Sequence, residues 1–174
     1  WFRRDLRLND NAALYHALRS GLPVIPVFIF DRSILDKLED KADKRVAFIH
    51  KALTDIQTTL KENGSSLYIL HDTPQQAFEK LTKEFDITAV YTNHDYEPYA
   101  ISRDAEVKKF LTAKDIVLHT FKDQVIFERN EVVKADGSPY TIFTPFSKIW
   151  KEKYAAQKKE RYPSEKHFNN LYQT

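Results

Sequence analysis

The sequence contains no cysteine, and only three of its 174 residues are glycine. Without cysteine, the chain has no disulfide framework, no thiolate zinc site and no cysteine-ligated iron–sulfur cluster. Gly21, Gly64 and Gly137 are far apart, and each fits a helix end or a turn. They form neither the Gly-x-Gly-x-x-Gly loop of dinucleotide-binding proteins nor a phosphate-cradling P-loop. The composition therefore argues against a dinucleotide-binding dehydrogenase.

Other signals of function are also missing. No segment reaches the ~18 consecutive apolar residues that span a bilayer, and no charged, then apolar leader marks a secretory signal. The six histidines lack the i, i+4 spacing that places two zinc ligands on one helix face. No Gly-x-Ser-x-Gly elbow supplies a hydrolase nucleophile. We therefore expect a cytoplasmic (intracellular) protein with no membrane partner, no metal site and no catalytic residues of its own.

The net charge of +2 hides an uneven distribution. Residues 148–174 contain seven Lys or Arg and three Asp or Glu. The first 147 residues contain 20 Lys or Arg and 22 Asp or Glu. A protein that binds a polyanion is expected to carry a basic stripe across its structured elements. Because the basic excess lies in the tail, the sequence predicts weak, salt-sensitive DNA binding by this chain alone.

With 42% apolar and 13% aromatic residues, the chain is long enough for one buried core and too short for two ordinary domains. Short apolar runs alternate with segments of helical period. We expect strands at 1–2, 24–30, 67–70, 87–91 and 116–121, and helices near 12–18, 44–62, 74–85, 99–113 and 144–154. This alternation predicts an α/β, Rossmann-like fold: a doubly wound, five-stranded parallel sheet with helices on both faces.

The order of elements also predicts where the domain ends. Residues 125–127 and 131–133 flank a short turn, and Thr144-Pro145 begins the last helix. From Lys158 the apolar period is lost. We expect an α/β domain at 1–157 and the start of an interdomain linker at 158–174. The first predicted strand has only two residues, and the predicted linker is not followed by a second domain in this sequence. We therefore expect this chain to be part of a longer protein.

The first ten residues, Trp1-Phe2-Arg3-Arg4-Asp5-Leu6-Arg7-Leu8-Asn9-Asp10, place three arginines and an aspartate just before a helix. Asn9 or Asp10 is predicted to cap that helix. In an open α/β sheet, a loop between a strand and a helix is a position for ligand binding. Arginines there pair with carboxylates or clamp an anion, and Asp5 is expected to hold one of them in place. The alternative is a purely structural salt-bridge cluster.

Five further blocks of sequence follow this opening. They are Val27-Phe28-Ile29-Phe30-Asp31, Arg45-Val46-Ala47-Phe48, Asp95-Tyr96-Glu97-Pro98-Tyr99, Arg103-Asp104-Ala105-Glu106-Val107 and Gly137-Ser138-Pro139-Tyr140-Thr141-Ile142-Phe143-Thr144-Pro145-Phe146. In this order, and together with the Trp-x-Arg-Arg-Asp-Leu-Arg opening, they resemble the DNA photolyase/cryptochrome family. The resemblance covers about residues 1 to 155.

The resemblance implies the N-terminal α/β domain of a light-dependent DNA repair enzyme, a deoxyribodipyrimidine photolyase. In that family, FAD binds in a C-terminal helical domain, which is absent from this chain, and reduced FAD repairs a cyclobutane pyrimidine dimer flipped out of DNA. The implied partners are that FAD domain and, through it, DNA containing pyrimidine dimers. The isolated fragment is expected to be inactive. Two alternatives stay open: a cryptochrome blue-light receptor domain, or a non-catalytic nucleotide- or flavin-binding α/β module.

The resemblance also implies an antenna chromophore in this domain. Charged side chains follow three predicted strands, and the candidate pocket consists of Arg4, Phe30, Asp31, Asp95 and Glu97. Folate-binding members have Asn-Glu where this sequence has Tyr99-Ala100, and this departure favours a deazaflavin or a flavin over folate. Without the resemblance, the same charged residues are interpreted as an ion-pair network that only fixes the loops.

Overall fold

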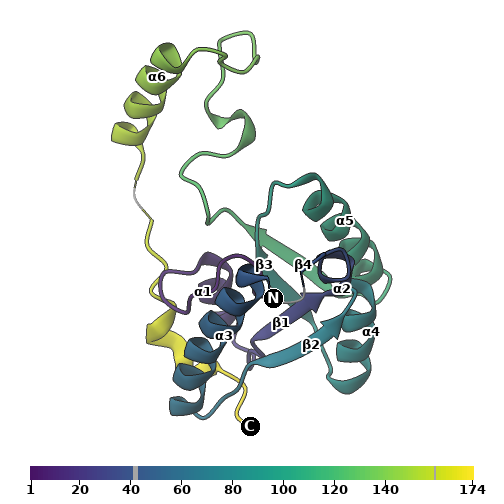
Figure 1. The fold of residues 1–174 in the computed structure, drawn as a ribbon. Helices are drawn as coiled ribbons and strands as arrows, with labels where there is room; N and C mark the ends of the chain where they lie inside the picture. The colour runs from purple at the N-terminus through teal and green to yellow at the C-terminus, as the bar shows by residue number, and fades with distance from the viewer. Residues whose placement is uncertain (41–42, 159) are drawn as a thin grey trace.

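The computed structural model describes residues 1–40, 43–158 and 160–174 (Figure 1). Strands and helices alternate up to residue 121. These elements are α1 (Ala12–Leu18), β1 (Val27–Asp31), α2 (Arg32–Leu35), α3 (Lys44–Glu62), β2 (Tyr68–Asp72), α4 (Pro74–Glu84), β3 (Ala89–Asn93), α5 (Pro98–Thr112) and β4 (Val117–Phe121). They are followed by the 3-10 helix η1 (Arg129–Glu131), α6 (Phe143–Ala156) and the 3-10 helix η2 (Ser164–Asn170).

The strands form two parallel pairs, β1 with β2 and β3 with β4, and the first residues of the chain join them. The Phe2 amide donates to the Val27 carbonyl at 2.8 Å, and the Trp1 amino group donates to the Tyr91 carbonyl at 2.9 Å. The spatial order is therefore β2, β1, residues 1–2, β3, β4. The predicted first strand is reduced to a single bridge between Phe2 and Phe28, so the described residues form four full strands around this short central segment.

Helices cover both faces of the sheet, which confirms the doubly wound α/β class. On one face, α1, α3 and the C-terminal residues enclose an apolar cluster of Phe2, Leu8, Leu14, Leu18, Phe28, Leu53, Ile56, Leu60, Leu67 and Leu171. On the other face, α4 and α5 enclose Val27, Ile29, Ala77, Phe78, Leu81, Val90, Val107, Leu111 and Ile116. β1 supplies both clusters because successive side chains of a strand point to opposite faces.

Local signals place the boundaries of α3 and α4. Thr73 accepts a hydrogen bond from the Gln76 amide, and Pro74 occupies the first position of α4, as the Thr-Pro pair predicts. α3 covers Lys44–Glu62, the range expected from its apolar spacing. Gly64 follows it with φ +72°, a left-handed conformation that glycine adopts without steric cost.

The predicted cap of α1 was wrong. The N-cap is Asn11, whose side-chain oxygen accepts from the Leu14 amide at 3.0 Å. Asp10 instead has φ +49°, and its carboxylate accepts from the Tyr162 amide at 2.8 Å. The cap thus lies one residue beyond the two predicted positions, and asparagine is as good a cap as either of them.

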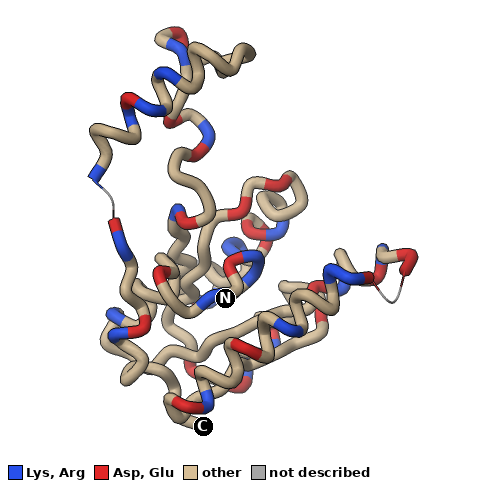
Figure 2. The backbone as a smooth tube through the Cα atoms, turned by 60° about the vertical axis from the view of Figure 1, so that its left-hand side comes forward, with Lys and Arg blue, Asp and Glu red and all other residues tan. Residues whose placement is uncertain are grey.

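Residues 122–158, which we call the arm, extend away from the sheet and its helices (Figure 1). η1 lies between residues 125–127 and 131–133, and α6 begins one residue before the predicted Thr144. None of the residues of α6 is buried, and Trp150 contacts Phe127 and Tyr154 within the arm itself. Basic and acidic residues are mixed along the chain rather than gathered in one stripe (Figure 2). None of the described helices is long and apolar enough to cross a membrane.

Residues 160–174, which we call the tail, return to the sheet. The Ser164 hydroxyl donates to the Leu8 carbonyl at 2.5 Å, and the Tyr172 amide donates to the Val24 carbonyl at 2.8 Å. Leu171 is buried in the cluster next to α1 and α3. Most of the segment that the sequence suggested as a linker therefore packs on the domain, which its weak apolar period did not predict.

Candidate functional site

The carboxyl ends of the parallel strands meet along one edge of the sheet, which we call the rim. Residues 3–5 follow the central segment, Asp31 ends β1, and residues 94–97 follow β3. Loops that follow parallel strands lie together at this edge, where open α/β sheets bind their ligands. The predicted site residues are thus drawn from three neighbouring positions in the sheet.

Arg4 and Glu97 form the most exposed part of the rim. Arg4 Nη1 lies 2.6 Å from Glu97 Oε1 and 3.7 Å from Asp95 Oδ1. The Arg4 and Glu97 side chains are 56% and 67% exposed, whereas Asp95 is buried. An exposed ion pair contributes little to stability, because water screens it and two long side chains lose freedom. Arg4 also has further N–H donors that a ligand can use.

Asp31 and Phe30 lie on a second part of the rim. Asp31 accepts hydrogen bonds from the Ser33 amide at 2.9 Å and from the Tyr99 hydroxyl at 2.5 Å. Burial, with the bond to Asp31, raises the pKa of Tyr99, so this phenol stays a neutral donor. Phe30 is half-buried and stands edge-on to Phe28, with ring centroids 5.0 Å apart. A cavity of about 280 Å³ opens beside Tyr99.

Arg103, on α5, links these two parts. Its Nη2 lies 3.9 Å from Asp95 Oδ2, and its guanidinium stands 5.7 Å from the centre of the Tyr99 ring and 5.0 Å from that of Trp1. The residue is only 8% exposed. A guanidinium held between aromatic faces and carboxylates has little freedom to move. Arg103 therefore braces the rim rather than facing solvent.

Arg3 differs from its neighbour Arg4. Arg3 Nη1 contacts the two carboxylate oxygens of Asp104 at 2.6 and 2.7 Å, and its Nη2 donates to the Asn93 carbonyl. Its side chain is 6% exposed. Charge-assisted bonds of this kind, shielded from water, hold the loop to α5 and β3. Of the two adjacent arginines, Arg3 is structural, and Arg4 is available to a ligand.

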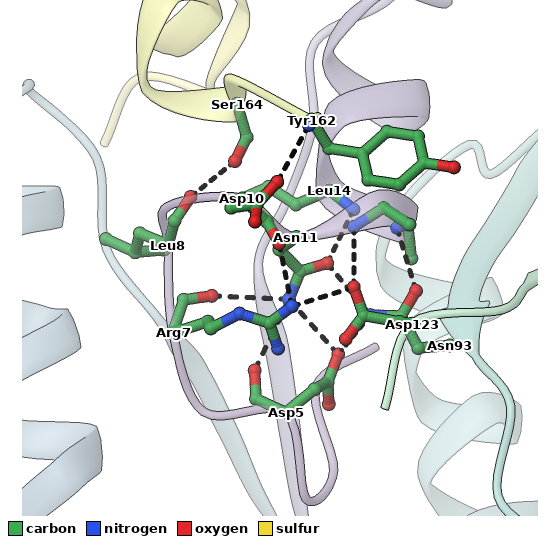
Figure 3. A network of polar contacts seen from close by, with 12 residues as sticks. Asp5, Arg7, Leu8, Asp10, Asn11, Leu14, Asn93, Asp123, Tyr162 and Ser164 are labelled. Carbon is green, nitrogen blue, oxygen red and sulfur yellow. Dashed lines mark hydrogen bonds and ion pairs between the residues drawn. The ribbon is translucent and has the colours of Figure 1, made fainter. Parts of the chain in front are cut away.

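A buried polar cluster behind the rim, which we call the hub, fixes the N-terminal loop (Figure 3). Asn93 Nδ2 donates to Asp5 Oδ2 at 2.6 Å and to Asn11 Oδ1 at 2.9 Å, while its Oδ1 accepts from the Ala13 amide at 2.9 Å. Asp5 holds one of the arginines through its backbone, because Asp5 Oδ1 accepts from the Arg3 amide at 2.8 Å. Asp5 also accepts from these amide side chains, since a buried carboxylate requires several donors.

The same loop holds the start of the arm and the start of the tail (Figure 3). Arg7 Nη2 lies 2.8 Å from Asp123 Oδ1 on the outgoing side, and Asp10 binds the Tyr162 amide on the returning side. The third arginine of the opening motif is therefore engaged within the fold. Of the charged opening residues, Arg4 alone belongs to the exposed part of the rim described above.

His94, which also follows β3, faces the arm. Its Nδ1 lies 2.7 Å from Glu128 Oε1, and its Nε2 lies 3.0 Å from the Thr120 hydroxyl. The Tyr96 hydroxyl donates to the same Glu128 oxygen, and burial, with this bond, raises the pKa of Tyr96. These contacts attach the start of the arm to the sheet. His94 therefore does not join the cluster of Arg4, Asp95 and Glu97.

Sequence reasoning missed the roles of Asn93 and Tyr99. Asn93 ends an apolar strand, and a lone amide there is the one local sign of a buried partner. Nothing near Tyr99 indicates that its hydroxyl meets Asp31, 68 positions away along the chain. Among the residues that the structure describes, no group of side chains is arranged to hold a metal ion.

The doubly wound fold defines an α/β domain of the Rossmann-like class. The model of the family described as DNA photolyase matches residues 1–164. The chain belongs to the DNA photolyase family.

Individual relatives agree with this assignment. The chain is 35% identical over 150 residues to a deoxyribodipyrimidine photo-lyase of Synechococcus sp., covering 86% of this chain and 31% of that protein. It is 31% identical over 147 residues to cryptochrome-1 of Arabidopsis thaliana, covering 84% and 21%. An archaeal photolyase from Sulfolobus tokodaii, solved with two FAD molecules, matches at TM-score 0.74 and 26% identity over 93% of this chain and 35% of that one. This chain thus spans 21% to 35% of the length of these relatives.

Proposed function

We propose that this chain is the N-terminal, antenna-type domain of a deoxyribodipyrimidine photolyase. Its membership of the DNA photolyase family over residues 1–164 carries the proposal. Repair of cyclobutane pyrimidine dimers then belongs to the FAD domain, and this chain meets DNA only through that domain. The mixed distribution of charge in Figure 2 supports this division of roles. A cytoplasmic location is part of the same proposal and rests on the sequence alone.

Within this domain, we propose that the rim binds the antenna chromophore. When bound, such a chromophore absorbs light and passes the excitation to FAD. The residues fit a planar ring with polar edges, because Arg4 donates hydrogen bonds, Glu97 and Asp31 accept them, and Phe30 offers an apolar face. The exposure of Arg4 and Glu97 supports the assignment, since both are accessible without disturbing the core.

A flavin or deazaflavin fits this rim better than folate. Tyr99 and Ala100 stand where folate-binding relatives carry Asn-Glu. Ala100 is only 2% exposed within α5, and the Tyr99 hydroxyl is engaged by Asp31, so neither supplies an acidic side chain to the rim. The Sulfolobus tokodaii photolyase, with its two FAD molecules and a novel light-harvesting cofactor, supports a flavin-type antenna in this family.

The test is a fluorescence titration of the chain with riboflavin and with a 5-deazaflavin. The wild-type chain is expected to bind at least one of them. Arg4→Glu places an acid beside Asp95 and Glu97 and is expected to weaken binding at least about tenfold, with little change in the melting temperature. Arg19→Glu, at the exposed C-cap of α1, is the matched control and should bind as the wild type does.

Two results would contradict the proposed pocket. The first is a wild-type chain that binds neither flavin at high concentration. The second is an Arg4→Glu chain that binds normally. If the rim only braces the loops, Arg4→Glu instead lowers the melting temperature, and there is no flavin binding to lose.

A cryptochrome is the second candidate, because Arabidopsis cryptochrome-1 is 31% identical to this chain. The two functions are distinguished by light-dependent repair of dimer-containing DNA, measured on the protein extended to the full length of its relatives. We expect repair by the extended protein and none by residues 1–174 alone. Light-dependent repair by the isolated chain would overturn the assignment of catalysis to the FAD domain, and none by the extended protein would favour a cryptochrome.

A further inference from the structure

The tail packs beside the C-terminal end of α3, and a reactive dipeptide lies at this junction. Asn63 is the C-cap of α3 and Gly64 follows it, and both residues are exposed. They form the one Asn-Gly pair of the sequence. In an Asn-Gly pair the asparagine loses its side-chain amide most readily, because glycine has no side chain to hinder the attack of its own nitrogen. Neither residue belongs to the rim or to the hub.

Loss of this amide proceeds by attack of the backbone on the side chain. The Gly64 nitrogen gives up its proton and bonds to Asn63 Cγ, the bond from Cγ to Nδ2 breaks, and ammonia leaves. The product is a five-membered succinimide ring. Water then opens the ring at either carbonyl, so residue 63 becomes aspartate or isoaspartate. The reaction consumes one water and releases one ammonia, and it needs no other reactant.

The end of α3 holds the reacting groups in an unproductive arrangement. The Gly64 amide donates to the Lys61 carbonyl at 3.1 Å, so its nitrogen is not free to lose the proton. Asn63 Nδ2 donates to the Thr59 carbonyl at 2.8 Å, which directs the side chain back along the helix. Asn63 also has ψ +18°, and closing the ring requires the following peptide unit to rotate away from this value. The folded conformation therefore protects the amide.

The tail fastens the same turn from outside. Gln173 Nε2 donates to the Asn63 carbonyl at 3.4 Å, and the Thr174 amide donates to the Gly64 carbonyl at 3.1 Å. The Gln173 side chain lies so close to Gly64 that a Cβ at this glycine would collide with it. The Asn63 carbonyl and the reactive Gly64 nitrogen belong to one peptide unit. This unit therefore cannot rotate while the tail is in place.

A buried leucine anchors this part of the tail. Leu171 is 2% exposed and belongs to the same apolar cluster as Leu60 of α3. Next to it, the Tyr172 amide donates to the Val24 carbonyl at 2.8 Å. Because these contacts are shared, the tail and the end of α3 are expected to open together, in a local opening that costs less than global unfolding.

We propose that Asn63 is a site of spontaneous deamidation, and that the tail sets its rate by holding the peptide unit between Asn63 and Gly64 in an unreactive conformation. The proposal rests on the chemistry of the amide and on the contacts of the tail. It does not depend on the chromophore or on the function of the family.

The product weakens the contact that protects the site. Aspartate or isoaspartate at position 63 places a negative charge at the C-terminal end of α3, where the helix dipole is already negative. The Nδ2 donor to the Thr59 carbonyl is also lost. Isoaspartate lengthens the main chain by one atom, which displaces the Gly64 carbonyl from the Thr174 amide. Deamidation is therefore a one-way change that loosens the tail from α3.

The test follows the mass of the peptide that contains Asn63 while the protein ages in mildly alkaline buffer. The wild-type chain is expected to deamidate at least about a hundredfold more slowly than the same chain unfolded in urea. Leu171→Ala removes the anchor and should raise the rate about tenfold or more. Gln173→Ala, at an exposed position that leaves the core intact, should raise it about threefold.

Leu111→Ala is the matched control for stability, because Leu111 is also buried but lies in the cluster beside α4 and α5. It should leave the rate within about twofold of the wild type. Asn63→Gln is the control for the site and should show no mass change in this peptide, since its longer side chain does not close the same ring.

Three results would overturn the proposal. Equal rates with and without urea would show that the fold gives no protection. Equal acceleration by Leu171→Ala and Leu111→Ala would show that the tail does not set the rate. Hydrogen exchange supplies the third: the Thr174 amide should exchange faster after deamidation, and an unchanged rate would contradict the loosening of the tail.

Discussion

The two ends of the sheet differ in chemistry although the same strands form both. At the rim, the strands run into loops that carry Arg4, Asp95 and Glu97, and water reaches two of these three side chains. At the opposite end, a cavity of about 540 Å³ lies between β1 and β3, and most of its lining residues, among them Val27, Phe78 and Val90, are apolar. The rim thus offers hydrogen-bond donors and acceptors to solvent, whereas the opposite end offers mainly apolar surface.

The hub lies behind the rim, and two of its residues, Asp5 and Asn11, also line the cavity at the opposite end. Asp5, Asn11 and Asn93 are buried, and their hydrogen bonds tie the N-terminal loop to α1 and β3. Because these groups satisfy one another, they are not available to a ligand at the rim. The most distinctive motif of the sequence is thus used mainly for structure, and Arg4 is its one exposed contribution to the rim.

The largest effect on stability is expected at the hub. Asn93→Ala tests whether the hub fixes the N-terminal loop. The substitution removes two donors to Asp5 and Asn11 and the acceptor of the Ala13 amide, and it leaves a buried carboxylate short of partners. We expect a loss of about 3 kcal/mol in the free energy of unfolding, measured with urea. Asn169→Ala, at an exposed position, should change it by less than about 0.5 kcal/mol. A loss below about 1 kcal/mol for Asn93→Ala would show that the hub does not fix the loop.

A smaller effect on stability concerns the Trp1 amino group, and its dependence on pH can be measured. The pKa of the Trp1 amino group is 8.0 in its ordinary state and about 6 in the fold. Between these values the unfolded chain binds more protons than the folded chain, so stability rises as pH increases from 6 to 8. The expected gain is about 2 to 3 kcal/mol, read from urea unfolding at each pH.

Acetylation of the Trp1 amino group is the control for this pH dependence. It removes the titrating group and should flatten the curve between pH 6.5 and 8. A slope below pH 6.5 should remain, because burial also lowers the pKa of His16. An unchanged slope above pH 6.5 after acetylation would contradict the enclosure of the terminus.

The smallest effect is expected at the rim. Arg4→Ala removes an exposed ion pair with Glu97 and should change the free energy of unfolding by less than about 1 kcal/mol. Arg3→Ala removes the buried pair with Asp104 and should cost clearly more in the same urea experiment. Equal losses for the two substitutions would mean that Arg4 is as structural as Arg3, and the distinction between rim and hub would fail.

Sequence patterns predicted the elements of the sheet and its helices well. The spacing of apolar residues located α3, and Thr73-Pro74 located the start of α4, because both signals act over a few neighbouring residues. The cap of α1 and the packing of the tail were not predicted. Asn11 caps α1 while Asp10 accepts from the Tyr162 amide, and Leu171 is buried where the tail packs next to α1, so both depend on residues far apart in sequence.

The sequence by itself determined the α/β class, the order of the elements and the family to which the chain belongs, since these depend on periodicity and on short motifs. Tertiary structure decided which charged residues share a site. Arg3 and Arg4 are adjacent in sequence and identical in chemistry, yet one is buried against Asp104 and the other faces water beside Glu97. Successive residues of an extended segment point in opposite directions. The carboxylate that each arginine binds lies about 90 residues or more away along the chain. Local sequence patterns carry no information over that distance.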